Sequence, residues 1–237
     1  MARASSETPD AATRDPQRVR AMFSRIAPRY DLANHLLSGG ADFIWRRRAA
    51  RIVSRWNPSR ILDLATGTGD LTLVLQRRLP KASIIAADFS EKMIELARRK
   101  GVQNAIVADA LQLPFDAGSF DAVTIAFGLR NMPDWAAALR EMRRMVSAEG
   151  RLLVLDFSKP IAIVQPLYRF YLHQLLPQIA SAVTGTGEAY AYLADSIETF
   201  PSGLAMLQLI EQCGFRSAEA TPLTAGIATI YTATASR

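Results

Sequence analysis

The sequence predicts an α/β fold in which a seven-stranded, mostly parallel sheet is covered by helices on both faces. Between residues 60 and 160, short runs that are apolar throughout alternate with amphipathic segments. Strands without a polar face belong in a parallel sheet that is buried on both sides, and the amphipathic segments supply the covering helices. After residue 200, a last amphipathic segment precedes "GFRSAEATPLTAGIATIYTATA", which is long enough for a closing pair of strands.

Length and composition indicate one globular domain. The 237 residues are 49% apolar and 21% charged, which is enough for a single sizeable core. The only cysteine, Cys213, excludes an intramolecular disulfide and favours a reducing compartment, and no apolar run follows a basic start as it would in a signal peptide. We therefore expect a cytoplasmic protein, with a homodimer as an open alternative to a monomer.

The chain divides into a tail and one domain with four parts. Residues 1–15 are small, polar and charged, and we expect a disordered tail. The single domain at 16–237 is expected to contain an N-terminal helical cap at 16–58 (helices near 16–27, 31–37 and 41–56), an alternating core at 59–160, a helical insertion at 161–200, and a C-terminal helix and strands at 201–237.

Boundary residues place the elements of the core in order. "RILDLA" leads to a helix from Asp70, "ASIIAAD" to a helix from Ser90, "NAIVAD" to a loop, and "FDAVTIAFG" to a helix before the last core strand, "GRLLVLDF". Ser90 is a suitable N-cap. Pro133 is suited to open the helix after the fourth strand, and Gly150 is suited to end the same segment.

The net charge of +6 originates in the first quarter of the chain, where residues 1–60 hold 12 arginines and 5 acidic residues. This excess is either an ordinary solvated helix face or a surface that attracts anionic lipid or nucleic acid. Five of the arginines fall on the helix expected at 41–56: Arg46, Arg47, Arg48, Arg51 and Arg55.

A glycine turn follows the first strand of the core. It reads Gly67-Thr68-Gly69, a pattern that by itself fits any tight connection between a strand and a helix. Asp88 ends the second strand, about 20 residues further on, where a carboxylate can bind ribose hydroxyls. Asp109, with Ala110 beside it, ends the third strand and is placed to meet an adenine edge. Because ligands of open parallel sheets bind at the carboxyl ends of the strands, these residues predict a nucleoside site.

Asp70 distinguishes between the nucleotides that such a site accepts. A carboxylate at a helix N-terminus is stabilised by the helix dipole, but it repels a pyrophosphate. S-adenosylmethionine has no phosphate and carries a sulfonium and an ammonium, which a nearby carboxylate favours. We therefore expect S-adenosylmethionine as the cofactor, although a plain helix-terminal acid remains an alternative role for Asp70. An NAD-dependent oxidoreductase is disfavoured, because Thr72 also stands where the third glycine is expected. A non-catalytic binding protein is a third class.

Several longer motifs carry a more specific resemblance. In order, they include "VRAMFSRIAPRYDLANHLLSGGADFIWRR", "ILDLATGTGDLT", "AFGLRNM", "LLVLDFSKP", "AYLADSIETFPS" and "GIATIYTA". From about residue 17 to the C-terminus, the chain resembles the ubiquinone/menaquinone biosynthesis C-methyltransferase family. The resemblance implies a Rossmann-like class I methyltransferase fold.

The resemblance also implies a reaction, namely methylation of a ring carbon on a polyprenylated quinol, above all of demethylmenaquinol to menaquinol. The equivalent benzoquinol step, or methylation of another hydrophobic small molecule, is the alternative. The family's cofactor positions correspond to Thr68, Asp88, Asp109 and Ala110. The chain departs from the family pattern at two positions. Ala126 stands where serine is common, which removes a hydroxyl contact, and Thr66 replaces a common glycine, which requires a negative φ at Thr66.

The reaction needs a carbon nucleophile, which a quinol provides once a phenolic proton is lost. A phenol titrates near pH 10, and an adjacent guanidinium lowers that pKa. Arg130 follows the fourth strand, and we expect it to stabilise the phenolate, with Asn131 and Tyr30 orienting the ring. A structural ion pair for Arg130 and helix packing for Tyr30 are the alternatives. Cys213 lies far along the chain from the strand ends, so we expect no covalent activation.

Other site classes are disfavoured. Methyltransferases that act on the exocyclic amino groups of nucleic acids often carry an acidic residue or Asn followed by Pro-Pro and an aromatic residue after the fourth strand. This chain has Gly128-Leu129-Arg130-Asn131, so we expect no nucleic-acid partner. His35 and His173 lack ligand-spaced cysteines, so we expect no metal site.

The helical insertion is apolar enough to hold a prenyl tail, although a helix buried in the fold explains it as well. Together with the basic first quarter, it predicts transient contact with an anionic membrane surface that weakens with salt. The residues concerned are Tyr168, Phe170, Tyr171, Leu172 and Leu175.

Overall fold

The computed structural model of the chain describes residues 38–175 and 195–235. The expected tail, the helices expected near 16–27 and 31–37, and Tyr30 lie outside the described residues.

The described residues contain one seven-stranded sheet with the strand order β3-β2-β1-β4-β5-β7-β6. Strands β1 to β5 pair in parallel, and β7 runs antiparallel to both of its neighbours. The predicted α/β fold class and the closing pair of strands are therefore confirmed. The strands are β1 Arg60–Leu64, β2 Ser83–Asp88, β3 Ala105–Val107, β4 Phe120–Ala126, β5 Val146–Phe157, β6 Phe215–Leu223 and β7 Ala228–Ala235.

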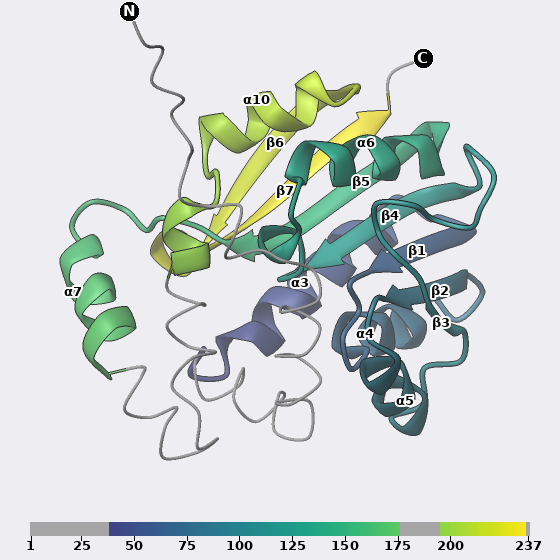
Figure 1. Ribbon diagram of the computed structural model, residues 1–237, viewed down its shortest axis with the longest axis horizontal. Coiled ribbons are helices and arrows are strands. Elements are labelled where there is room, and N and C mark those ends of the chain that lie inside the picture. The colour runs from purple at the N-terminus through teal and green to yellow at the C-terminus, as the bar shows by residue number, and fades with distance from the viewer. Residues whose placement is uncertain (1–37, 176–194, 236–237) are drawn as a thin grey trace, which may run out of the picture.

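Helices cover the sheet in two layers (Figure 1). On one side, α3 Ala41–Arg55 and α4 Asp70–Arg78 share a buried apolar cluster with the sheet, and α5 Glu91–Arg99 packs beside β2 and β3. On the other side, α6 Trp135–Met145 and α10 Leu204–Gln212 pack on the larger cluster. Shorter helical segments are η3 Leu129–Asn131, α7 Gln165–Phe170, η4 Tyr171–Leu175 and η5 Thr224–Gly226.

Two of the three boundary expectations in the core need correction. The hydroxyl of Ser90 accepts a hydrogen bond from the backbone N–H of Met93, so Ser90 is the N-cap of α5 as predicted. Helix α6, in contrast, begins two residues after Pro133, because the carboxylate of Asp134 accepts from the N–H of Ala137 and caps the helix there. Gly150 does not end that segment but lies inside β5, where a Cβ would be 2.9 Å from the carbonyl oxygen of Asp121.

The connection from β1 to α4 is a tight turn with several left-handed residues. The φ angles of Gly67 and Gly69 are 57° and 87°, and that of Ala65 is 48°, whereas Thr66 is not among the residues with positive φ. The condition for tolerating threonine in place of glycine at 66 is therefore met. Gly69 is also in close contact, because a Cβ built on it would lie 2.4 Å from Cγ2 of Val102.

We predict that Gly69→Ala lowers the free energy of unfolding by about 2–5 kcal/mol, because left-handed strain of about 1–2 kcal/mol adds to overpacking of about 1–3 kcal/mol. Urea titration measures the change. Gly101→Ala is the matched control, since Gly101 has a φ of 102° but open space around its Cβ position. Equal losses in the two variants would show that the contact with Val102 has no energetic weight.

Candidate functional site

A cavity lies at the carboxyl ends of β1, β2, β3 and β4, around the point where the strand order reverses. Its empty space is about 940 Å³, a volume that includes the open mouth. Open parallel sheets bind ligands at this place. The lining residues include five of the residues singled out in the sequence: Gly67, Asp88, Asp109, Ala110 and Asn131.

Asp88 connects the cavity to the glycine turn. Its Oδ2 accepts from the N–H of Gly67 at 2.8 Å, and its Oδ1 accepts from the N–H of Ser90 at 2.9 Å. Burial raises the pKa of this carboxyl, and the two backbone donors partly oppose that rise. A carboxylate has about four lone-pair sites, and the backbone N–H groups of Gly67, Ser90 and Phe89 occupy three of them, so Asp88 can still accept a hydrogen bond from a ligand hydroxyl.

The third strand contributes the neighbouring wall of the cavity. Asp109 accepts from the N–H of Leu111 at 2.8 Å through Oδ1, which folds the loop after β3 back on itself. This fold presents Asp109, Ala110 and Leu111 to the same cavity as Asp88. The structure thus brings together the carboxylates that the sequence placed at the ends of the second and third strands.

Two strand ends approach each other closely at the cavity. Ala65, after β1, and Phe127, after β4, have positive φ angles of 48° and 60°, and both line the cavity. A Cβ on Gly128 would lie 2.4 Å from the Cβ of Ala65. Non-glycine residues in the left-handed region are strained and concentrate at functional sites.

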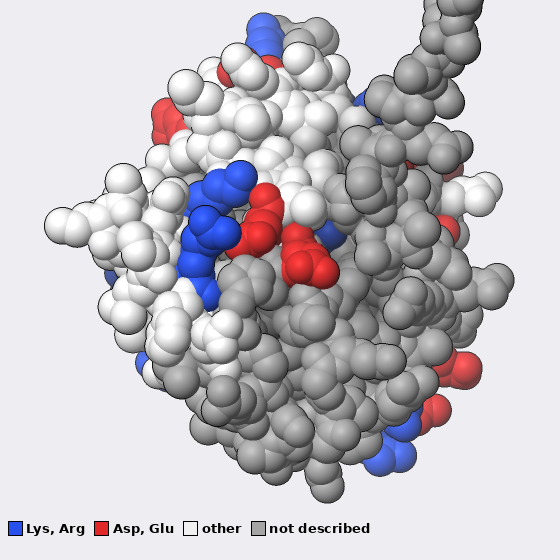
Figure 2. Space-filling view, turned by 60° about the vertical axis from the view of Figure 1, so that its left-hand side comes forward, with Lys and Arg blue, Asp and Glu red and all other residues white. Residues whose placement is uncertain are grey.

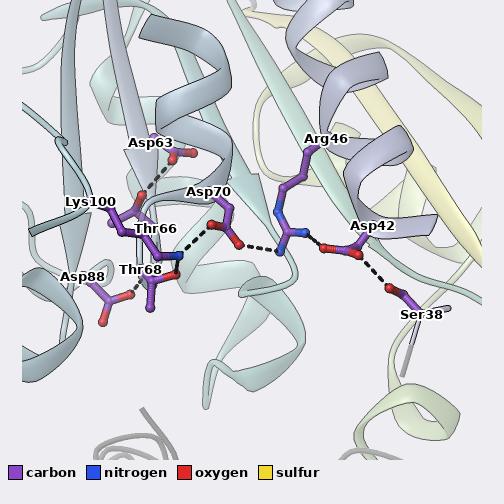
Figure 3. A network of polar contacts seen from close by, with 10 residues as sticks. Ser38, Asp42, Arg46, Asp63, Thr66, Thr68, Asp70, Asp88 and Lys100 are labelled. Atoms are coloured by element: carbon purple, nitrogen blue, oxygen red, sulfur yellow. Dashed lines mark hydrogen bonds and ion pairs between the residues drawn. The ribbon is translucent and has the colours of Figure 1, made fainter. Parts of the chain in front are cut away.

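Thr68, Gly69 and Asp70 are not among the residues that line this cavity. Asp70 instead lies between two cations, as Figure 3 shows. Its Oδ1 is 2.9 Å from Nζ of Lys100, and its Oδ2 is 4.0 Å from Nη2 of Arg46. The charge that was expected to favour a cationic cofactor is therefore already balanced, and direct contact of Asp70 with a cofactor stays a prediction.

A second carboxylate lies under the turn and was missed in the sequence. Asp63, in the middle of the apolar run of β1, is fully buried, and burial raises its pKa. The hydroxyls of Thr66, Thr72 and Thr124 lie 2.9, 2.6 and 2.7 Å from its oxygens and donate to them. A lone acid in a buried strand is the signal that could have identified it, because a buried carboxylate requires donors.

Arg130 is buried and paired. Its Nη1 donates to Oδ1 of Asp156 at 2.8 Å and to the carbonyl oxygen of Phe127 at 2.5 Å, and its guanidinium carbon lies 5.1 Å from the ring centre of Phe157. Arg130 does not line the cavity, whereas its neighbour Asn131 does. The ion pair weighed above as the alternative role is present. Yet Nε of Arg130 is buried with no hydrogen-bond partner in the described part of the chain.

A second cavity lies beside the start of the insertion. Tyr168 of α7 and Leu172 are buried and line it, together with Pro160 and Ile197. Phe170 is exposed instead, and Tyr171 is half-buried. Burial raises the pKa of Tyr168, and the charge of Arg130 partly opposes this, which places the tyrosine near that guanidinium. The side chain of Leu175 lies outside the described residues.

The main cavity suits a nucleoside without phosphate groups better than it suits a dinucleotide. None of its described lining residues is Lys or Arg, so a pyrophosphate would meet no cation, whereas Asp88 and Asp109 offer acceptors to hydroxyl and amino groups. Within residues 38–175 and 195–235, no group of three or more His, Cys, Asp or Glu side chains could hold a metal ion. No helix in the same ranges is both long and apolar enough to cross a membrane.

Comparisons with known proteins identify the family. The demethylmenaquinone methyltransferase of Thermus thermophilus is 48% identical over 89% of this chain and 98% of that protein. The ubiquinone/menaquinone biosynthesis C-methyltransferase UbiE of Citrifermentans bemidjiense is 43% identical over 92% of this chain and 96% of that protein. A SAM-dependent methyltransferase structure from Thermotoga maritima shares the fold, with a TM-score of 0.66, 18% identity, and coverage of 91% of this chain and 99% of that one. Residues 11–235 match the model of the ubiE/COQ5 methyltransferase family, so this chain belongs to that family and, as predicted, uses S-adenosylmethionine as its methyl donor.

Proposed function

We propose that the protein methylates a ring carbon of demethylmenaquinol to form menaquinol. The observation that carries the proposal is the similarity to the Thermus protein, which extends over 89% of this chain and 98% of that protein. The equivalent benzoquinol is the second candidate, because the relative from Citrifermentans is named for both quinones. The test is an assay of the purified protein with S-adenosylmethionine and each reduced quinone, in which mass spectrometry detects the methylated ring.

We propose that the main cavity holds the cofactor, which supplies a methyl group on a cationic sulfur when it is bound. Asp88 binds the ribose hydroxyls, Asp109 and Ala110 contact the adenine, and the backbone of Gly67 contacts the amino-acid end. Thr68, Gly69 and Asp70 form the rest of the same turn but do not line the cavity. The mixture of apolar lining residues and two carboxylates supports this assignment.

We propose that the acceptor ring lies beside Asn131, which lines the cavity and follows β4. The unpaired Nε–H of Arg130 then donates to the phenolate oxygen. A buried donor without a partner destabilises the protein by about 1–3 kcal/mol, and a hydrogen bond to the phenolate would remove this penalty. Asp156, fully buried, holds Arg130 in place by accepting one hydrogen bond from Nη1 of the guanidinium and one from the backbone N–H of the same residue. Transfer merges a sulfonium with a phenolate, so a dry site favours it. Tyr30, outside the described residues, is proposed to orient the ring.

The polyprenyl tail and the membrane complete the proposal. Tyr168 and Leu172 would hold the tail in the second cavity. The exposed side of α3 would approach the lipid, because it carries Phe43 and Ile44 next to exposed arginines, a composition typical of interfacial helices. On the face shown in Figure 2, basic and acidic side chains of the described residues lie side by side. The proposal therefore depends on the exposed residues of α3 and not on this face. The exposed arginines of α3 are Arg47, Arg48, Arg51 and Arg55.

We predict that Arg130→Lys lowers kcat for the quinol about 100-fold while the affinity for S-adenosylhomocysteine stays unchanged. Lysine keeps the charge beside Asp156 but lacks the Nε–H, and loss of one donor to a developing oxyanion typically costs a factor of about 100–1,000. Steady-state kinetics and calorimetry measure the two quantities. Arg140→Lys, at an exposed position on α6, is the control. Unchanged turnover in Arg130→Lys would contradict the role of this arginine.

We predict that the affinity for S-adenosylhomocysteine falls as the pH is lowered, beginning at a higher pH than the one at which a free aspartate is protonated. Hydroxyl groups bind the ionised carboxylate of Asp88, and burial raises the pKa of that group above its ordinary value of 3.8, so protonation begins at a higher pH than for a free aspartate. Asp88→Asn should bind about 10–100-fold more weakly at pH 7 and lose this pH dependence, since a hydrogen bond to a charged group contributes about 1.5–3 kcal/mol. Calorimetry at several pH values measures both effects, and a flat profile in the wild type would contradict the assignment.

We predict that the protein binds phosphatidylglycerol vesicles at low salt and dissociates as salt is added, because exposed charges are screened. The double variant Arg47→Gln/Arg51→Gln should weaken binding about 30-fold, since each basic residue near an anionic surface contributes about 1 kcal/mol. Co-sedimentation measures binding, and Arg140→Gln/Arg216→Gln removes the same charge from other exposed positions. Equal losses in the two double variants would rule out α3 as the contact.

A further inference from the structure

Lys100 lies behind the glycine turn and outside the cofactor cavity. It follows the last residue of α5, and its ammonium donates to Oγ1 of Thr68 at 2.8 Å and to Oδ1 of Asp70 at 2.9 Å. Thr68 and Asp70 are the two neighbours of Gly69. The ammonium therefore closes a bridge across the one residue between them, as Figure 3 shows.

This bridge constrains the most flexible residue of the turn. Gly69 has a φ of 87°, which is one of many conformations that glycine can adopt. Fixing its backbone in this one conformation therefore costs more conformational entropy than fixing any other residue type. The backbone at Gly69 also packs on Val102, just after Lys100 in the chain. The segment from Lys100 to Val102 thus supports the turn from behind, by packing at Gly69 and by charge on either side of it.

Two carboxylates hold the two ends of the same turn. At its start, Asp88 accepts from the N–H of Gly67 inside the cavity. At its end, Asp70 is held by Lys100 on one oxygen and approached by Arg46 of α3 on the other. Helix α5 reaches both ends, because its cap Ser90 adjoins Asp88 and its last turn presents Lys100. A turn fixed at both ends before the ligand arrives pays less ordering cost on binding.

We propose that Lys100 is a positioning residue for the cofactor: by bridging Thr68 and Asp70, it holds the turn from Gly67 to Asp70 in the shape that binds S-adenosylmethionine. The proposal rests on the placement of the cofactor in the main cavity and is independent of which quinol is methylated. Lys100 itself does not touch the ligand, so its effect appears in cofactor affinity and not in the methyl-transfer step.

The test compares Lys100→Met with the wild type in calorimetric titrations with S-adenosylhomocysteine. We expect Kd to rise about tenfold, which corresponds to about 1.4 kcal/mol. The KM for S-adenosylmethionine should rise in parallel, with kcat unchanged at saturation. Lys100→Arg keeps the charge and the donors and should recover most of the affinity. Thermal unfolding without ligand should change little, because the side chain of Lys100 is 31% exposed and such ion pairs add little to stability.

Lys92→Met is the matched control, since Lys92 is an exposed lysine on the same helix. An equal loss of cofactor affinity in Lys92→Met would show that the loss in Lys100→Met comes from the change in net surface charge, and it would overturn the proposal. Affinity in Lys100→Met equal to that of the wild type would also overturn it. Should Lys100→Met not fold, Lys100→Gln replaces it under the same criteria.

A double-mutant cycle with Asp70→Asn tests the route of the effect. If Lys100 acts through Asp70, its removal should cost less affinity once Asp70 is neutral, and additive losses would contradict this route. Failure of the wild type to bind S-adenosylhomocysteine is a distinct result, because it would overturn the cofactor site and not only the role of Lys100.

Discussion

The hydrogen bond from the N–H of Gly67 to Asp88 is the contact on which the rest of the site depends. It ties the end of β2 to the turn that leaves β1, so two neighbouring strand ends become one rigid wall of the cavity. The same carboxylate accepts from Ser90 and thereby also places the first turn of α5. Through one partly buried carboxylate, the position of a ligand at Asp88 is linked to the geometry of the sheet, of the turn and of helix α5.

Buried charge follows a common pattern in this sheet. Asp63 and Asp156 each interrupt an otherwise apolar strand near its carboxyl end, and each is matched by its own donors, hydroxyls for Asp63 and the arginine at 130 for Asp156. Leaving either carboxylate without a partner would cost several kcal/mol. In the described sheet, these two buried carboxylates therefore lie towards the edge where the ligand is proposed to bind.

Hydrophobic periodicity and boundary residues were sufficient to predict the sheet, the closing strand pair and the N-cap at Ser90. They misplaced the start of α6, because a cap at Asp134 competes with the preceding proline, and they missed the early start of β5 at Val146, ahead of Gly150. At the site, strand ends correctly placed Asp88 and Asp109 in one cavity. The partners of Asp70 and Arg130 could not be read from the sequence, because Lys100 and Asp156 are distant in the chain and meet these residues only through the folded sheet.

The threonine at 66 gives this chain a turn that glycine at the same position would not reproduce. Its hydroxyl donates to a carboxylate that is sealed from water, and it also lies 2.9 Å from the hydroxyl of Thr72. Glycine at position 66 would remove a hydrogen-bond donor from Asp63 and add backbone freedom next to Ala65. Asp63, Thr66 and Thr72 are therefore coupled through their hydrogen bonds, so a change at any one of them alters what is tolerated at the other two.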